Sequence, residues 1–67
     1  MKYNVGDVVK TKQGVKNPCR VGVISEIDAG AVHPYKVTFS NGENIWYRGD
    51  SLTIFEPKKS IDYNAGL

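Results

Sequence analysis

The segment 35–42 constrains the fold most, because it has the pattern of one strand followed by a tight turn. Its first part alternates apolar and polar side chains, so that Tyr35, Val37 and Phe39 face one way. An Asn-Gly pair follows at once, and this pair is a strong short-range signal for a β-hairpin. The chain must therefore place another strand directly after the turn, and residues 44–48 supply it.

The polar pattern on both sides of the turn selects the length of the hairpin loop. A two-residue loop would pair Thr38 with Ile45 and mix polar and apolar side chains on one face. We expect instead a three-residue loop over 41–43, which keeps one face apolar and turns Tyr47 inward and Trp46 outward. The pairs in this register are Phe39 with Ile45, Val37 with Tyr47, Thr38 with Trp46 and Lys36 with Arg48.

The rest of the chain supplies three more strand-like segments between turn residues. We expect strands within 1–11, after a turn at Gly6-Asp7, and over 20–27 and 52–55. The segment 20–27 does not alternate strictly, which predicts a bulge near Ser25-Glu26 that bends the sheet. Polar loops are expected over 12–19 and 28–34, and a turn over 49–51.

Residue counts support strands and exclude several classes of protein. The chain has 8 Val, 5 Ile and 3 Thr against only 3 Ala and 2 Leu, which favours a sheet over a helical bundle. Its 67 residues suffice for one small domain. One Cys and one His exclude an intramolecular disulfide and a His/Cys metal cluster, and a lone Cys fits the reducing cytoplasm. No run of 18 apolar residues is present, so we expect no membrane span.

The composition changes near the C-terminus. We expect a domain over residues 1–57 and a polar tail over 58–67. The tail either frays or packs on the domain through Ile61, Tyr63 and Leu67. The sequence carries no signal for an oligomeric state.

The order of the motifs resembles a known group of small barrels. The motifs are Val5-Gly6-Asp7-x-Val9, Gly22-x-Ile24-x-x-Ile27, Tyr35-x-Val37-x-Phe39-x-Asn41-Gly42, Tyr47-Arg48 and Leu52. This order, over residues 3–56, resembles Src-homology-3-like barrels of the Tudor, KOW and chromo-barrel type, and the Mind-bomb-type ubiquitin-ligase repeat. The hydrophobic framework of such barrels matches at Val9, Ile24, Val37, Phe39, Tyr47 and Leu52.

The resemblance implies an all-β fold, a five-stranded Src-homology-3-like small β-barrel. Such barrels bind peptides, methylated Lys or Arg, DNA, RNA or neighbouring domains. Lone barrels of this length also occur among bacteriophage-encoded proteins, where they bind host machinery, so a bacteriophage origin is one interpretation of this chain.

The sequence contains few side chains in arrangements that catalysis needs. His33 and Cys19 lie in different expected loops, whereas a nucleophilic pair needs them adjacent together with a third, orienting group. Asp7, Asp28 and Asp50 lie in expected turns, where Asp stabilises the backbone. The glycines are isolated and form no phosphate-binding loop. We therefore expect no enzymatic activity, no catalytic residues, no cofactor and no metal.

Trp46 is the strongest candidate for binding a partner. In the expected register it points outward beside Lys36, Thr38 and Arg48, and an exposed Trp among cations is typical of an anchor for a protein partner. The alternative is that Trp46 covers an open end of the barrel or packs on the tail. The leading hypothesis is thus a cytoplasmic protein-interaction module that modulates a larger machine.

Four basic residues suggest a second hypothesis, a DNA- or RNA-binding barrel. Stacking on Trp46 would combine with phosphate contacts from Lys36, Arg48 and a basic first loop. The residues of that loop and its flanks are Lys10, Lys12, Lys16 and Arg20. Their alternative role is to keep a solvated loop from pairing with another sheet edge. The formal net charge is only +2, and it falls to +1 without residues 58–67, which carry Lys58, Lys59 and Asp62; this small charge places nucleic acid second.

Overall fold

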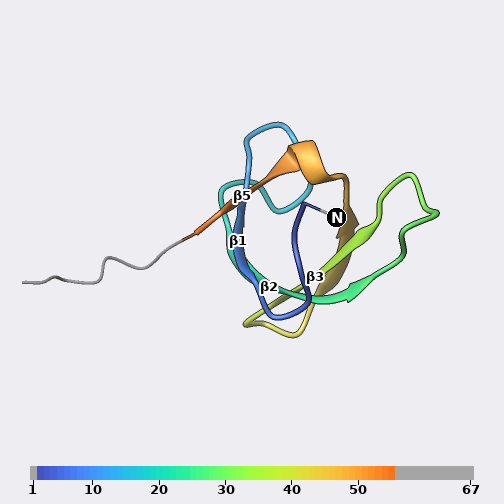
Figure 1. Ribbon diagram of the computed structural model, residues 1–67. Coiled ribbons are helices and arrows are strands. Elements are labelled where there is room, and N and C mark those ends of the chain that lie inside the picture. Colours follow the sequence, from blue (N-terminus) through green and yellow to red (C-terminus); the bar gives the residue numbers. More distant parts are fainter. Residues whose placement is uncertain (1, 56–67) are drawn as a thin grey trace, which may run out of the picture.

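The computed structural model describes residues 2–55, which form one antiparallel β-sheet (Figure 1). The elements are β1 (Val8–Thr11), β2 (Val21–Ile27), β3 (Tyr35–Phe39), β4 (Asn44–Tyr47), the short 3-10 helix η1 (Gly49–Ser51) and β5 (Leu52–Ile54). The strands pair in the order β4-β3-β2-β1-β5, so β4 and β5 form the two edges. The prediction of an all-β fold with five strands is confirmed. The predicted boundary between a domain over 1–57 and a tail over 58–67 lies outside the described residues.

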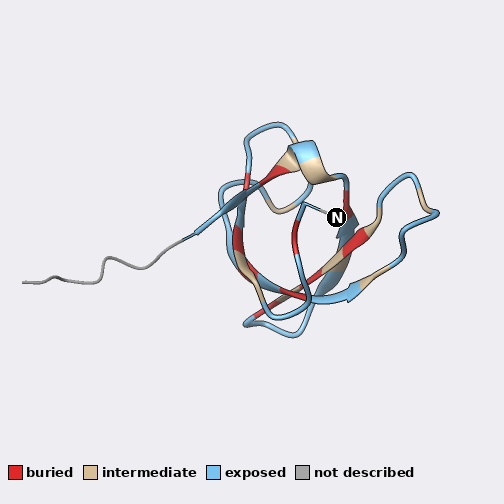
Figure 2. Cartoon of the chain, viewed as in Figure 1, coloured by how far each residue is buried: buried red, intermediate tan, exposed pale blue. Residues whose placement is uncertain are grey.

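The sheet curls around a small core, and the buried residues lie on its concave side (Figures 1 and 2). The buried hydrophobic side chains are Tyr3, Val9, Ile24, Tyr35, Val37, Phe39, Tyr47 and Leu52. All six framework positions that the sequence predicts are therefore in the core. Within residues 2–55 the edge strands β4 and β5 have no ladder between them, and η1 connects one to the other.

Strand β2 bends where the sequence predicts a bulge. Its register against β3 shifts between Ile24 and Glu26, which leaves Ser25 between the two paired segments. Nearby, Gly22 is buried opposite Phe39. A Cβ atom at Gly22 would lie 2.5 Å from Cγ1 of Val37 and 2.9 Å from the carbonyl oxygen of Thr38. Only a residue without a side chain lets β2 and β3 approach this closely.

The loop of the β3–β4 hairpin has three residues, as expected, but it lies one residue earlier in the chain. It spans 40–42, because the amide of Phe39 donates to the carbonyl of Glu43 and the amide of Gly42 donates to the carbonyl of Phe39. Gly42 has a φ of 91° and occupies the left-handed position that ends such a loop. Asn41 Oδ1 accepts the Glu43 amide, which holds the end of the loop against the start of β4.

The predicted cross-strand pairs are therefore wrong by two residues. Lys36 lies opposite Trp46, not Arg48, and Thr38 lies opposite Asn44, not Trp46. Ile45 faces Val37 and Tyr47 faces Tyr35, in place of the expected partners Phe39 and Val37. Because a shift of two residues preserves the face of every side chain, the predicted inward and outward directions are unchanged.

The N-terminal segment closes one side of the core through tyrosine hydroxyls. The Tyr3 hydroxyl donates to the carbonyl of Leu52 at 2.8 Å, and the Tyr35 hydroxyl accepts the amide of Lys2 at 3.0 Å. The rings of Tyr3 and Tyr35 meet edge to face, with their centroids 5.3 Å apart. These contacts place Tyr3 in the core, a role that the sequence pattern did not predict.

Replacing Gly22 by alanine should destabilise the fold strongly, since the new methyl group would collide with Val37 and with β3 backbone. We expect a loss of about 2 kcal/mol or more in the free energy of unfolding, measured by urea denaturation. Gly30→Ala is the matched control, because the nearest atom to a Cβ there lies 3.9 Å away. Equal effects of the two substitutions would contradict the close β2–β3 contact.

Candidate functional site

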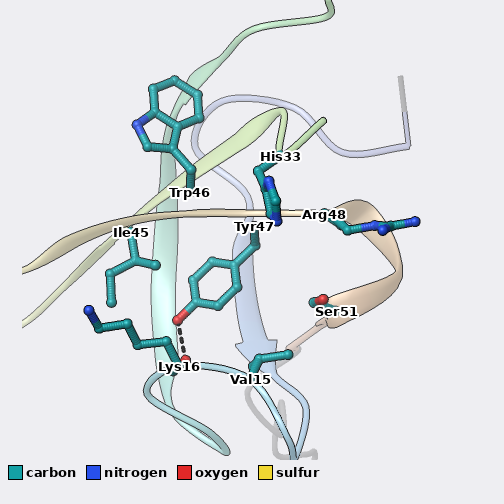
Figure 3. A pocket seen from close by; sticks show the side chains of 8 residues that line it. All are labelled: Val15, Lys16, His33, Ile45, Trp46, Tyr47, Arg48 and Ser51. Carbon is teal, nitrogen blue, oxygen red and sulfur yellow. Dashed lines mark hydrogen bonds between the residues drawn. The ribbon is translucent and has the colours of Figure 1, made fainter. Parts of the chain in front are cut away.

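Trp46 projects from the outer face of the edge strand β4. It is 38% exposed, whereas the neighbouring Tyr47 is only 3% exposed. Figure 3 shows the two rings on opposite sides of the strand, with Ile45 on the same side as Tyr47. The predicted outward direction of Trp46 is confirmed, while its role in binding stays a prediction.

The side chains predicted to accompany Trp46 are only partly gathered around it. Lys36 lies directly across from Trp46, and its Nζ is 3.6 Å from the Glu26 carboxylate. Arg48 follows β4, and its Nε is 3.7 Å from Asp50 Oδ1. Arg48 and its partner are exposed and Lys36 is half-buried beside an exposed carboxylate, so each ion pair contributes little to stability and either cation can exchange its partner.

Thr38 belongs to a different polar group on the same outer face. Its hydroxyl lies 2.6 Å from Asn44 Oδ1 and 2.9 Å from Ser25 Oγ. These contacts tie β2, β3 and β4 together on the outside of the sheet. Thr38 therefore has a structural function in the sheet and lies diagonally across from Trp46, while its role in binding stays a prediction.

A pocket of about 240 Å³ opens beside β4 (Figure 3). Its wall combines the loop before β2, the loop before β3, the strand β4 and η1. The lining residues are Val15, Lys16, His33, Ile45, Trp46, Tyr47, Arg48 and Ser51. Sequence reasoning missed Val15, His33, Ile45 and Ser51 because they come from segments that meet only in the folded sheet, and no local motif marks them.

The loop over 12–19 is attached to the hairpin at two points. The Tyr47 hydroxyl donates a hydrogen bond to the carbonyl of Lys16, which forms the floor of the pocket (Figure 3). Asn17 Nδ2 donates to Glu43 Oε1 at 2.8 Å. Hydrogen bonds from the side chains of Asn17 and Asn41 hold the pKa of the Glu43 carboxyl below its usual value, and the bond from Asn17 has the larger effect.

The four basic residues predicted to contact nucleic acid lie on β1 and on the segment that joins it to β2, and their role in binding stays a prediction. Lys10 lies on β1 opposite Val21 and Thr53, on the outer face of the sheet. Lys12 comes directly after β1 and is exposed to solvent. The other two, Lys16 and Arg20, act electrostatically on Glu43, and the Arg20 guanidinium also lies 5.8 Å from the centroid of the Phe39 ring. The positive charge of these two residues is thus partly balanced locally.

In the described part of the chain, the side chains considered for catalysis or metal binding do not gather at one site. His33 lines the pocket, and Cys19 is exposed and does not line it. Among residues 2–55, no three His, Cys, Asp or Glu side chains gather closely enough to hold a metal ion. The same residues contain no helix of the length and apolarity needed to cross a membrane.

Comparisons with known proteins identify the fold but no family. No protein-family model matches the chain, and no curated protein sequence matches it. The structure resembles the NMR structure of the Bacillus subtilis protein YorP, with a TM-score of 0.77 and 22% sequence identity. The similarity covers 96% of this chain and 82% of that chain. At this level of identity the likeness concerns the fold alone.

The hydrogen bond from Tyr47 to the loop should disappear at alkaline pH. Burial, and then the nearby Glu43, raise the pKa of the Tyr47 hydroxyl, so the folded state favours the neutral donor. Its contribution is complete below about pH 10, the pKa of an unfolded tyrosine, and is lost as pH rises through the raised value. Tyr47→Phe should cost about 1 kcal/mol of unfolding free energy at pH 7.

The measurement is urea unfolding of both proteins between pH 7 and pH 11. The gap in stability between wild type and variant should narrow above about pH 10. All other ionisable groups are common to both proteins, so their effect cancels in the difference. A gap that stays constant to pH 11 would show that the hydroxyl proton does not stabilise the loop.

Proposed function

We propose that this chain is a non-enzymatic protein-interaction module that binds its partner at Trp46 and the adjoining pocket. The observation that carries the proposal is the 38% exposure of Trp46 beside a pocket, whereas eight other hydrophobic side chains among residues 2–55 are buried in the core. Trp is the residue type most enriched among the few that dominate interface energies. Arg48 and Lys36 flank it and supply polar contacts at the rim.

The fold proposed for this module is a Src-homology-3-like small barrel. The strand order β4-β3-β2-β1-β5, the bulge in β2 and the curled sheet support this assignment. Such a scaffold presents its loops and its edge strand on a rigid core. The exposed thiol of Cys19 fits a reducing compartment such as the cytoplasm, and the small size fits a module that modulates a larger machine.

The distribution of charge favours a protein partner over nucleic acid. Each cation near Trp46 has a carboxylate close by, Glu26 for Lys36 and Asp50 for Arg48. Lys16 and Arg20 are not in ion-pair contact with Glu43, but their charges help to lower the pKa of its carboxyl. A surface that neutralises phosphates needs cations without such competitors, gathered along one face. The DNA- or RNA-binding function is therefore the second candidate. Its one support is the exposed ring of Trp46, which offers a surface for a base to stack on.

Trp46→Ala should reduce partner capture while leaving the fold intact. Immobilised wild-type and variant proteins are compared for the proteins they retain from a cell lysate, quantified by mass spectrometry. A central anchor contributes about 2 kcal/mol or more, so retention should fall by roughly 30-fold. Phe55→Ala is the matched control, since Phe55 is 37% exposed but lies beyond β5 at the opposite edge.

Two results would contradict this assignment. If Trp46→Ala and Phe55→Ala lose the same proteins equally, Trp46 is not the anchor. If Trp46→Ala unfolds the domain in a thermal denaturation experiment, its ring is a structural element of the core.

Labelled single- and double-stranded DNA and RNA should show no specific binding at low salt. The experiment titrates wild type and Lys36→Glu at about 50 mM and 200 mM salt, by fluorescence anisotropy. Phosphate contacts would give an affinity that falls steeply with salt and drops further in the variant. Tight binding with these two properties would establish the nucleic-acid function in place of the protein-binding one.

A further inference from the structure

We infer that the free edge of β4 receives an extended, acidic segment of the partner protein as an additional β-strand. This inference rests on the proposed protein-binding function and specifies the shape and chemistry of the partner. Its three supports are the backbone groups that the edge leaves open, the absence of protecting residues within β4, and the cationic pocket beside it.

The hydrogen-bond pattern of the hairpin fixes which backbone groups face outward from the edge. Phe39 and Glu43 form a hydrogen-bonded pair, and hydrogen-bonded and non-hydrogen-bonded pairs alternate along an antiparallel ladder. Ile45 and Tyr47 therefore direct their amide and carbonyl groups toward β3. Asn44 and Trp46 direct theirs away from the sheet, and β4 has no neighbouring strand on that side within residues 2–55.

The edge of β4 lacks the devices that usually prevent strand addition. Natural edge strands carry Lys, Pro, a bulge or an inward-pointing charge that blocks pairing. The four residues of β4 contain no charged residue and no proline, and its register against β3 is continuous. The nearest charged residues, Glu43 and Arg48, stand before and after the strand. The edge is thus open over the residues that would pair.

An added strand would present its side chains to two different surfaces. Successive side chains in a strand point to opposite faces, so one set would lie beside Trp46 on the outer face. The alternate set would point to the inner face, where Val15, Ile45 and Tyr47 line one side of the pocket. At about 240 Å³ this pocket is smaller than the typical site of a drug-sized ligand, and it is better matched to single side chains of a peptide.

The charges around the pocket select an acidic side chain. Lys16 and Arg48 line opposite sides of the pocket, whose lining also includes His33, Val15 and Ile45 (Figure 3). Two carboxylates lie near these cations. Asp50 is 3.7 Å from Arg48 in an exposed pair, and Glu43 already accepts bonds from Asn17 and Asn41.

A carboxylate on the partner strand would pair with Lys16 at one side of the pocket, or with Arg48 at the other side in place of the exposed Asp50 contact. We therefore expect an Asp or Glu at an inward position, with apolar residues on either side of it to pack against Trp46.

The test begins with a random 12-residue peptide display library selected against the full chain. The most enriched peptide is synthesised and added to the ¹⁵N-labelled full chain, and amide hydrogen exchange is measured by NMR. We expect the enriched sequences to share an acidic residue between apolar ones. Binding should slow the exchange of the Asn44 and Trp46 amides at least tenfold, because those amides gain carbonyl acceptors.

A chemically synthesised chain with an N-methyl group on the Trp46 amide provides a sharper comparison. This change removes one outward donor and preserves the indole, so the peptide should bind at least tenfold more weakly. N-methylation of Ser40, in the hairpin loop, is the matched control and should leave binding unchanged. Lys16→Gln should weaken the peptide that carries Glu and have little effect on the same peptide with Gln in its place.

Three results would overturn the inference. Peptide binding that shifts the Trp46 indole signal but leaves both amides in fast exchange would mean side-chain docking, and the proposed function would survive. Failure of the library to yield a binder would exclude the extended acidic peptide, while lysate capture with Trp46→Ala would still test the proposed function separately. Protection of both amides without peptide, rising with protein concentration, would identify a second copy as the occupant of the edge.

Discussion

The close approach of β2 to β3 at Gly22 is the contact on which the rest of the structure depends. Because Gly22 has no side chain, Val37 and Phe39 can occupy the space that a Cβ would fill. The bulge after Ile24 then bends β2, and the sheet curls over its core. This curl brings the loop over 12–19 against the β3–β4 hairpin, and the Tyr47 hydroxyl secures it there.

The same packing determines what remains for binding. Every second residue of β3 is buried, and the inward residues of β4 complete that surface. Trp46, on the opposite face, is left 38% exposed at an edge of the sheet. Exposed aromatic surface of this kind is typical of interaction sites when a pocket and flanking charges accompany it. The candidate site is therefore a consequence of how the core is filled.

The sequence predicted the elements well because their signals are local. Alternation over residues 35–39, the Asn-Gly pair and the irregular pattern of 20–27 each act within a few residues. The hairpin loop was predicted one residue too late, because loops over 40–42 and over 41–43 leave the same side chains facing inward. The choice between them depends on the φ of Gly42 and on the hydrogen bond to the Asn41 side chain. The pocket could not be predicted, since Val15, His33 and Ser51 meet β4 only after the sheet curls.

Amide hydrogen exchange along β4 of the free protein tests the central claim most directly. An open edge predicts an alternating pattern, with the Ile45 and Tyr47 amides protected by β3 and the Asn44 and Trp46 amides exchanging rapidly. Protection of Asn44 and Trp46 equal to that of their neighbours, at low protein concentration, would contradict it. The edge would then be closed within the chain, and Trp46 would not stand beside a free strand.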